Sequence, residues 1–386
     1  MNTKTKQPIV IFSLPHPNFF SQHNGIGGHV AHAIGDVQGL RKNDCKVIAI
    51  IPSSAPILFI KECYKVIVIP QKSSGFNWNK AMLSAIIKTA KIYRADFVYM
   101  RYSAGFMPWI PWLRWRTNNT PIVLEVNSLL TQRTPAAYLL DKVVLRLVDD
   151  VVTISEKQAE VIRRVGGDSM RRRITVMPNA VDHTRFNDLD KQVNSDYLKH
   201  PTQNNCLRIG YIGILKPGYG LELLLDAYSD IRKVRNDVEL MICGEGPLYK
   251  DLLDQAKKIP NVIITGAIPF DSVPYYLQSI DIAVYTTTQN NLFQNPIKMY
   301  EYMASGCAIV AAKTPVTNDL LHKGKFGILY DIGSQKQLVE GITSLLEDDK
   351  RRIDFGYFVH ENVEQKHTWT ARFKDYIAGL EKKDIL

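Results

Sequence analysis

The chain has 386 residues, 45% of them hydrophobic and 22% charged, with a formal net charge of +10. This composition is typical of an ordinary globular protein with room for two domains of about 150–200 residues each. No apolar run reaches the roughly 18–20 residues that a membrane-spanning helix needs, and the five scattered cysteines lack metal-ligand spacing, which indicates a reducing cytosol.

Short apolar runs alternate with helical patterns along the whole chain, which predicts βα units and parallel sheets. The first half contains seven predicted strands, at Ile9–Leu14, Lys46–Ile51, Val66–Ile69, Phe97–Met100, Ile122–Val126, Asp150–Ile154 and Ile174–Val176. The second half contains six, at Leu207–Ile212, Val238–Cys243, Val262–Thr265, Ile282–Tyr285, Ala308–Ala312 and Gly327–Tyr330. Helices are predicted between them, for example at Lys80–Tyr93 and Glu156–Val165.

This order predicts an α/β protein with two Rossmann-like, doubly wound domains facing across a cleft. The first domain is expected at residues 1–190, a polar linker at 191–205 and the second domain at 206–350. Residues 351–386 are expected to form a helical segment that packs back toward the first domain.

Positive charge is concentrated in the first half of the chain. Residues 1–195 contain 26 Lys and Arg against 14 Asp and Glu, whereas residues 196–386 contain 22 against 24. This asymmetry indicates that the first half of the chain binds an anionic partner. A phosphorylated substrate, a phospholipid surface and a nucleic acid are the candidates. The basic residues show no nucleic-acid-binding signature, so no nucleic-acid partner is expected.

A charged strand-to-helix crossing lies between Phe293 and Gly306. Pro296, Lys298 and Glu301 follow the predicted strand Ile282–Tyr285 and open a helix. In a parallel sheet this crossing lies at the carboxyl edge, where ligands bind. A lysine can meet phosphate oxygens and a carboxylate can accept hydrogen bonds from a ribose diol. The alternative is a helix start that only carries surface charges.

Glycine-rich loops follow three other predicted strands. Such loops let backbone N–H groups approach a phosphate closely, although a flexible turn with an incidental lysine is the alternative in each case. The residues expected to contact ligand are Gly27, Gly28, Gly213, Lys216, Gly244 and Gly246.

An ordered series of segments resembles family 4 glycosyltransferases of the GT-B type over nearly the whole chain. In the first half the matching segments are Gly27-Gly28-x-x-x-His32, Asp96–Tyr102, Pro121–Asn127, Val152–Ser155 and Met177–Asp182 with Phe186. In the second half they are Gly244–Pro247, Ile264–Ala267, Tyr276–Asp281 and Pro296–Gly306.

The resemblance implies a retaining glycosyltransferase, of hexosyltransferase type, in cell-envelope polysaccharide or glycolipid synthesis. The second domain would bind a UDP- or GDP-sugar and the first a glycan or lipid-linked acceptor, with no cofactor and no metal required. The residues implied in catalysis are Lys216, Lys298, Arg101 and Glu125. Those implied in donor binding are Gly27, Gly28, Gly213, Lys216, Gly244, Gly246, Pro296, Lys298 and Glu301.

The chain also departs from the family pattern. Ile214 and Tyr219 stand where relatives usually have an arginine and a lysine, and Phe293 replaces the first member of an acidic pair. Arg101 stands where many relatives have a histidine. Two alternatives therefore stay open: a GT-B nucleotide-sugar epimerase and a catalytically silent, membrane-associated binding protein.

The segment Phe106–Arg116 contains three tryptophans and two arginines. Aromatic rings and long cations suit a bilayer interface, although the tryptophans would also suit a core. Together with Arg163, Arg164 and Arg171–Arg173, this segment predicts a cytoplasmic protein that attaches peripherally to the anionic inner face of the plasma membrane.

Overall fold

The computed structural model describes residues 7–16, 19, 28–52, 57–70, 75–187, 206–289 and 295–386. The chain forms two compact units. Unit 1 comprises Met1–Gln22, His29–Asn179 and Trp369–Leu386, and unit 2 comprises His23–Gly28 and Ala180–Thr368. Gly27, Phe293 and the whole of the expected linker lie outside the described residues.

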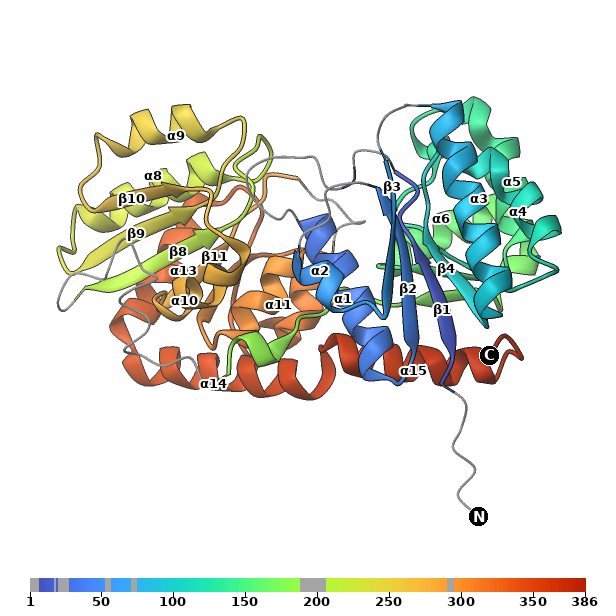
Figure 1. The fold of residues 1–386 in the computed structure, drawn as a ribbon. Helices are drawn as coiled ribbons and strands as arrows, with labels where there is room; N and C mark the ends of the chain where they lie inside the picture. The colour runs from blue at the N-terminus through green and yellow to red at the C-terminus, as the bar shows by residue number, and fades with distance from the viewer. Residues whose placement is uncertain are drawn as a thin grey trace, which may run out of the picture. The chain divides into compact units, whose positions relative to one another are not determined.

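Unit 1 is built on a parallel seven-stranded sheet in the order β3-β2-β1-β4-β5-β6-β7 (Figure 1). The inner strands β1, β2, β4, β5 and β6 are buried nearly throughout, as the continuous apolar runs of the sequence require, whereas the edge strands β3 and β7 are partly exposed. They are β1 (Ile9–Ser13), β2 (Lys46–Pro52), β3 (Lys65–Ile69), β4 (Phe97–Arg101), β5 (Ile122–Glu125), β6 (Asp150–Thr153) and β7 (Ile174–Val176).

Helices cover both faces of this sheet (Figure 1). Alternate strand residues such as Ile11, Val98 and Leu124 pack into one core with the helices of one face. Those helices are α3 (Phe76–Tyr93), α4 (Ile110–Arg116), α5 (Tyr138–Leu147) and α6 (Glu156–Gly166). The other face carries α1 (Gly28–Lys42), and α2 (Ile57–Lys61) connects β2 to β3.

The last helix of the chain, α15 (Trp369–Glu381), belongs to unit 1. It packs on α1, where a Cβ at Gly35 would lie 2.1 Å from the Trp369 ring. Lys383 Nζ and Tyr376 Oη both donate to the Asp150 carboxylate, at 2.6 and 3.0 Å. The expected C-terminal segment is therefore divided, because α14 (Asp349–Lys366) packs on β12 (Ala308–Ala312) of unit 2.

Unit 2 is built on a parallel six-stranded sheet in the order β10-β9-β8-β11-β12-β13. Its strands are β8 (Leu207–Ile212), β9 (Val238–Cys243), β10 (Val262–Gly266), β11 (Ile282–Tyr285), β12 (Ala308–Ala312) and β13 (Ile328–Tyr330). Besides α14, its helices are α8 (Leu221–Arg232), α9 (Tyr249–Ala256), α10 (Val273–Gln278), α11 (Ile297–Ala304), α12 (Pro315–Leu320) and α13 (Gln335–Glu347).

Short 3₁₀ turns complete the chain. In unit 1 they are Met107–Trp109, Leu130–Gln132, Pro135–Ala137 and Asp168–Met170. In unit 2 they are His183–Arg185, Phe270–Ser272 and His322–Gly324.

In each sheet, successive strands are added first on one side of the first strand and then on its other side. The change falls between β1 and β4 in unit 1 and between β8 and β11 in unit 2. This is the topological switch point of a doubly wound fold, and ligands bind at the carboxyl ends of the strands there. The predicted α/β class and both doubly wound units are confirmed, and every predicted strand is present with ends within one residue.

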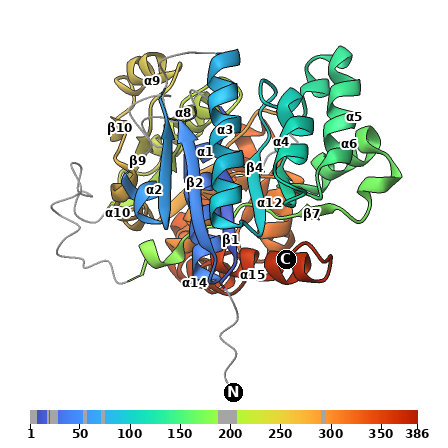
Figure 2. The same ribbon diagram turned by 45° about the vertical axis from the view of Figure 1, so that its right-hand side comes forward.

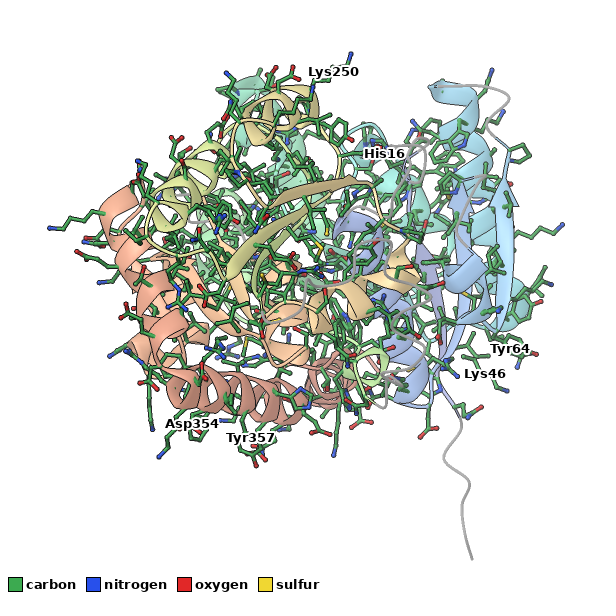
Figure 3. The ribbon with its side chains drawn as sticks, turned by 90° about the vertical axis from the view of Figure 1, so that its left-hand side faces the viewer. His16, Lys46, Tyr64, Lys250, Asp354 and Tyr357 are labelled. Carbon is green, nitrogen blue, oxygen red and sulfur yellow. The ribbon has the colours of Figure 1, made fainter. Side chains whose placement is uncertain are left out.

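The free edge of the unit 1 sheet is charged. Lys65 Nζ donates to Tyr93 Oη at 2.7 Å, and the Lys46 ammonium lies 5.6 Å from the Tyr64 ring (Figure 3). Lys65 is on the edge strand β3, where a lysine discourages pairing with another chain, and Lys46 is on the adjacent strand β2. Among the described residues, none of the helices combines the length and the apolar character that crossing a bilayer requires.

Candidate functional site

Two loops meet closely at the carboxyl edge of the unit 2 sheet. The loop after β8 donates from Gly213 N to Cys243 O and from Leu215 N to Glu245 O, both at 2.9 Å. A Cβ at Gly244 would lie 1.8 Å from Gly213 O, and one at Gly246 would lie 2.2 Å from Leu215 O. Because the loops touch through their backbones, Gly244 and Gly246 are required for packing, whatever contact they make with ligand.

Gly213 also leaves room for the lysine predicted at the start of α11. A Cβ at Gly213 would lie 2.4 Å from Lys298 Nζ, and the backbone there has a φ of +153°. Lys298 follows Pro296, which caps α11 with an extended backbone. The structure therefore places Gly213, Pro296 and Lys298 together at the switch point.

Within the part of the chain that the structure describes, the Lys298 ammonium contacts aromatic residues and no carboxylate. It is partly buried and donates to Tyr211 Oη at 2.6 Å, while Tyr211 Oη donates to Ile214 O at 3.1 Å. Burial lowers the pKa of Lys298 to about 7, with the charge of Lys216 acting in the same direction and that of Glu301 opposing it. A half-desolvated lysine without a counter-ion favours binding of an anion.

Lys216 provides a second cation beside Lys298. Its ammonium lies 4.5 Å from the centre of the Tyr219 ring, and the Lys298 ammonium lies 5.1 Å from the same ring. In the described part of the chain Lys216 forms no ion pair with a carboxylate. The two lysines predicted from separate loops are therefore neighbours.

Glu301 lies one turn after Lys298 on α11 and is also partly buried. Burial raises the pKa of its carboxyl, and the charges of Arg185 and then Lys298 oppose this effect. Within the described residues, no side chain or backbone N–H donates to this carboxylate. A carboxylate without such a donor, near Arg185 and Lys298, can accept hydrogen bonds from hydroxyl groups.

Arg185 is a site residue that the sequence reasoning did not single out. Its guanidinium stacks 3.7 Å from the centre of the Phe270 ring and donates to Phe270 O at 2.6 Å. From there its charge acts on Glu301. It precedes Phe186 in one of the family-like segments, but nothing in that segment indicates a partner 116 residues further along the chain.

In unit 1 the predicted residues Arg101 and Glu125 lie in a buried ionic cluster with His32 and Asp36. Arg101 Nη2 is 2.9 Å from Glu125 Oε1 and 3.4 Å from Asp36 Oδ2. His32 Nε2 is 3.1 Å from Glu125 Oε1 and 3.3 Å from Asp36 Oδ1. Two carboxylates thus face one guanidinium and one imidazole.

Electrostatics keeps this cluster internally neutral. Burial would lower the pKa of His32, but Asp36 and Glu125 together raise it. Burial would raise the pKa of Glu125, but Arg101 and His32 hold it well below its usual range. The ligand atoms of His32, Asp36 and Glu125 lie within 4.8 Å of one another, as a metal site would need. Arg101 already supplies the balancing charge between the carboxylates, so this donor set fits a divalent cation poorly.

Arg101 also contacts the first turn of α1. Its Nη1 donates to His29 O at 3.0 Å, one residue after Gly28 at the start of α1. Glu125 is fully buried and accepts from Asn127 Nδ2 at 2.9 Å. The geometry suits residues that position a loop.

The predicted membrane segment forms a short helix with an exposed aromatic face. Trp112 and Trp115 on α4 are 50% and 65% exposed, and the Arg116 guanidinium lies within 6 Å of both rings. The alternative that they pack in the core is wrong for these two tryptophans. The neighbouring helix α5 adds Leu139 and Val143, at 71% and 50% exposure (Figure 2). We call Trp112, Trp115, Arg116, Leu139, Lys142 and Val143 the aromatic–basic patch.

Two family comparisons together cover most of the chain. Residues 26–185 match the family described as Glycosyltransferase Family 4, and residues 206–348 match the one described as Glycosyl transferases group 1. The fold is that of GT-B glycosyltransferases. The crystal structure of the Anabaena protein HepE in complex with UDP-glucose superposes on it with a TM-score of 0.70. The superposition covers 97% of this chain and 99% of that one, at 16% sequence identity.

Curated relatives are similar over shorter stretches. Alpha-monoglucosyldiacylglycerol synthase of Streptococcus pneumoniae is 29% identical over 113 residues, which are 28% of this chain and 25% of that protein. The Campylobacter jejuni N-acetylgalactosamine-N,N'-diacetylbacillosaminyl-diphospho-undecaprenol 4-alpha-N-acetylgalactosaminyltransferase is 29% identical over 146 residues, 36% of this chain and 38% of that protein. The chain thus spans less than half the length of these two relatives.

Proposed function

This chain belongs to the glycosyltransferases of family 4 and group 1, and we propose that it moves a sugar from a UDP- or GDP-sugar to a glycan or lipid-linked acceptor. The observation that carries the proposal is the grouping of Lys216, Lys298 and Glu301 at the switch point of unit 2, with no ion pair among described residues to neutralise them. Three such groups suit a ligand that has a diphosphate at one end and a ribose diol at the other.

In this proposal Glu301 accepts hydrogen bonds from the ribose, and Lys216 and Lys298 bind the diphosphate. As the bond from the sugar to the diphosphate breaks, negative charge grows on the departing phosphate. The two ammonium groups stabilise that charge without a metal. Gly213, Gly244, Gly246 and Pro296 hold the loops and the helix start in the positions that this requires.

The reaction is proposed to proceed with retention at the anomeric carbon, by attack on the same face from which the diphosphate leaves. A double displacement needs an accessible carboxylate nucleophile. The close carboxylate pair in unit 1, Asp36 and Glu125, is buried and neutralised by Arg101 and His32. We assign Arg101 and Glu125 to positioning Gly28 and the start of α1 on the acceptor side.

The acceptor is proposed to be lipid-linked or a growing glycan of the cell envelope. The two curated relatives carry diacylglycerol and diphospho-undecaprenol in their names. The aromatic–basic patch is proposed to attach the protein peripherally to an anionic membrane, where such acceptors reside. Tryptophan and leucine would enter the interface, while Arg116 and Lys142 meet lipid phosphates.

The test starts with calorimetric titration of UDP, GDP and their common sugar conjugates. The conjugate that binds is then incubated with and without a membrane lipid extract, and products are analysed by mass spectrometry and NMR. We expect acceptor-dependent transfer with a retained anomeric configuration. A changed sugar nucleotide formed without acceptor would indicate the epimerase instead, and binding without any turnover would indicate the silent binding protein. Failure of every nucleotide to bind would refute the proposal.

A further inference from the structure

Two ammonium groups lie over the Tyr219 ring, and neither has a carboxylate partner among the described residues. Lys216 Nζ is 4.5 Å and Lys298 Nζ is 5.1 Å from the centre of its ring. Like charges this close repel each other, and a cation over an aromatic face is stabilised by the ring's negative face. The Tyr219 ring therefore offsets part of the cost of holding the two lysines together.

Two hydrogen bonds from the segment that follows β11 hold the backbone around Tyr219. Thr286 Oγ1 donates to Tyr219 O at 2.5 Å, and Thr288 N donates to Gly218 O at 3.0 Å. Gly218 and Gly220 have φ values of +85° and +69°, so the chain turns sharply on both sides of the ring. These two hydrogen bonds hold the loop without involving the ammonium groups of the lysines.

Tyr211 holds the ammonium group of Lys298. Its ring is fully buried, and its hydroxyl donates to Ile214 O, which leaves a lone pair directed at Lys298 Nζ 2.6 Å away. The hydroxyl thus accepts from Lys298 in a single orientation. Tyr211 and Tyr219 together restrict the positions of both ammonium groups before any ligand arrives.

We propose that Tyr211 and Tyr219 are positioning residues that hold Lys216 and Lys298 as a preformed two-cation receptor for the donor's diphosphate. The proposal rests on the proposed function.

The test compares Tyr219→Leu with the matched control Tyr219→Phe, which keeps the ring. Titrations use the full chain with UDP or GDP, whichever the parent binds, and with the corresponding nucleoside, which lacks the diphosphate. Cation–π contacts at partly desolvated sites predict a loss of diphosphate affinity of about five- to thirty-fold for Tyr219→Leu. Nucleoside affinity should stay at the parent value, and Tyr219→Phe should bind the diphosphate within about two-fold of the parent.

Tyr211→Phe provides a second arm, because it removes only the hydroxyl that accepts from Lys298. We expect weaker diphosphate binding and unchanged nucleoside binding. Equal loss of nucleoside and diphosphate affinity in Tyr219→Leu would show a general structural defect and overturn the proposal. Unchanged diphosphate affinity in both Tyr219→Leu and Tyr211→Phe would overturn it as well. A parent protein that binds neither UDP nor GDP would instead refute the proposed function.

Discussion

Binding of the donor should take up a proton at Lys298. In the free protein burial lowers the pKa of this lysine to about 7, with Lys216 adding to the effect and Glu301 opposing it. Tyr211 and Tyr219 are the other titratable groups against it. A bound diphosphate adds negative charge beside the ammonium and favours its protonated form, so the pKa rises on binding.

The size of this uptake follows from the pKa of the free protein. At pH 8 a group with a pKa of about 7 is charged in roughly one molecule in eleven, so binding takes up about 0.9 proton. At pH 7 the uptake falls to about 0.5 proton. Affinity should therefore be highest below pH 7 and should fall toward ten-fold per pH unit above it, until the pKa of the bound state is reached.

Isothermal titration of UDP in buffers with different enthalpies of ionisation measures the uptake directly as the slope of enthalpy against ionisation enthalpy. At pH 8 the phosphates of UDP are already deprotonated, because the second pKa of a phosphate monoester is about 6. The control is Lys298→Arg, whose side chain stays charged and should bind without proton uptake. A parent slope near zero at pH 8, with measurable binding, would refute this account of Lys298.

Three further predictions concern the donor loops and the membrane. Glu301→Gln should lower donor affinity about ten-fold and leave the thermal midpoint unchanged, since charged hydrogen bonds contribute roughly 1.5–3 kcal/mol against about 1 for neutral ones; parent-like titration curves would argue against the ribose assignment. Gly244→Ala should lower the thermal midpoint by several degrees, because its Cβ would lie 1.8 Å from Gly213 O; an unchanged midpoint would contradict the tight loop contact. The double variant Trp115→Ala, Leu139→Ala should sediment less with anionic vesicles than the control Ile353→Ala, whose exposed apolar residue is on α14. Equal binding of the parent protein to neutral and anionic vesicles at low salt would count against membrane attachment.

The strands and the α/β class could be predicted from the sequence. Buried parallel strands are continuous apolar runs, and each run can be recognised from a few consecutive residues. The sequence also predicted Lys298 and Glu301 near the start of a helix. Residues three apart on a helix lie on the same face, so their proximity followed from their spacing in the chain. The helical segment expected at residues 351–386 consists of α14 and α15 in the structure, and the sequence did not indicate the break at residues 367–368. The part that packs on the first unit is α15, through its contact with α1.

Only the tertiary structure brought together residues that are distant in the chain. Tyr211 and Tyr219 contact Lys298 because β8 and β11 are neighbours in the sheet, and Arg185 acts on Glu301 across 116 positions. The environment of Glu125 also depends on the tertiary structure: the resemblance implied a role in catalysis, and the structure buries this carboxylate against Arg101 and His32. A sequence pattern records which face of a strand is apolar, whereas the charge and solvent access of one carboxylate depend on every element packed around it.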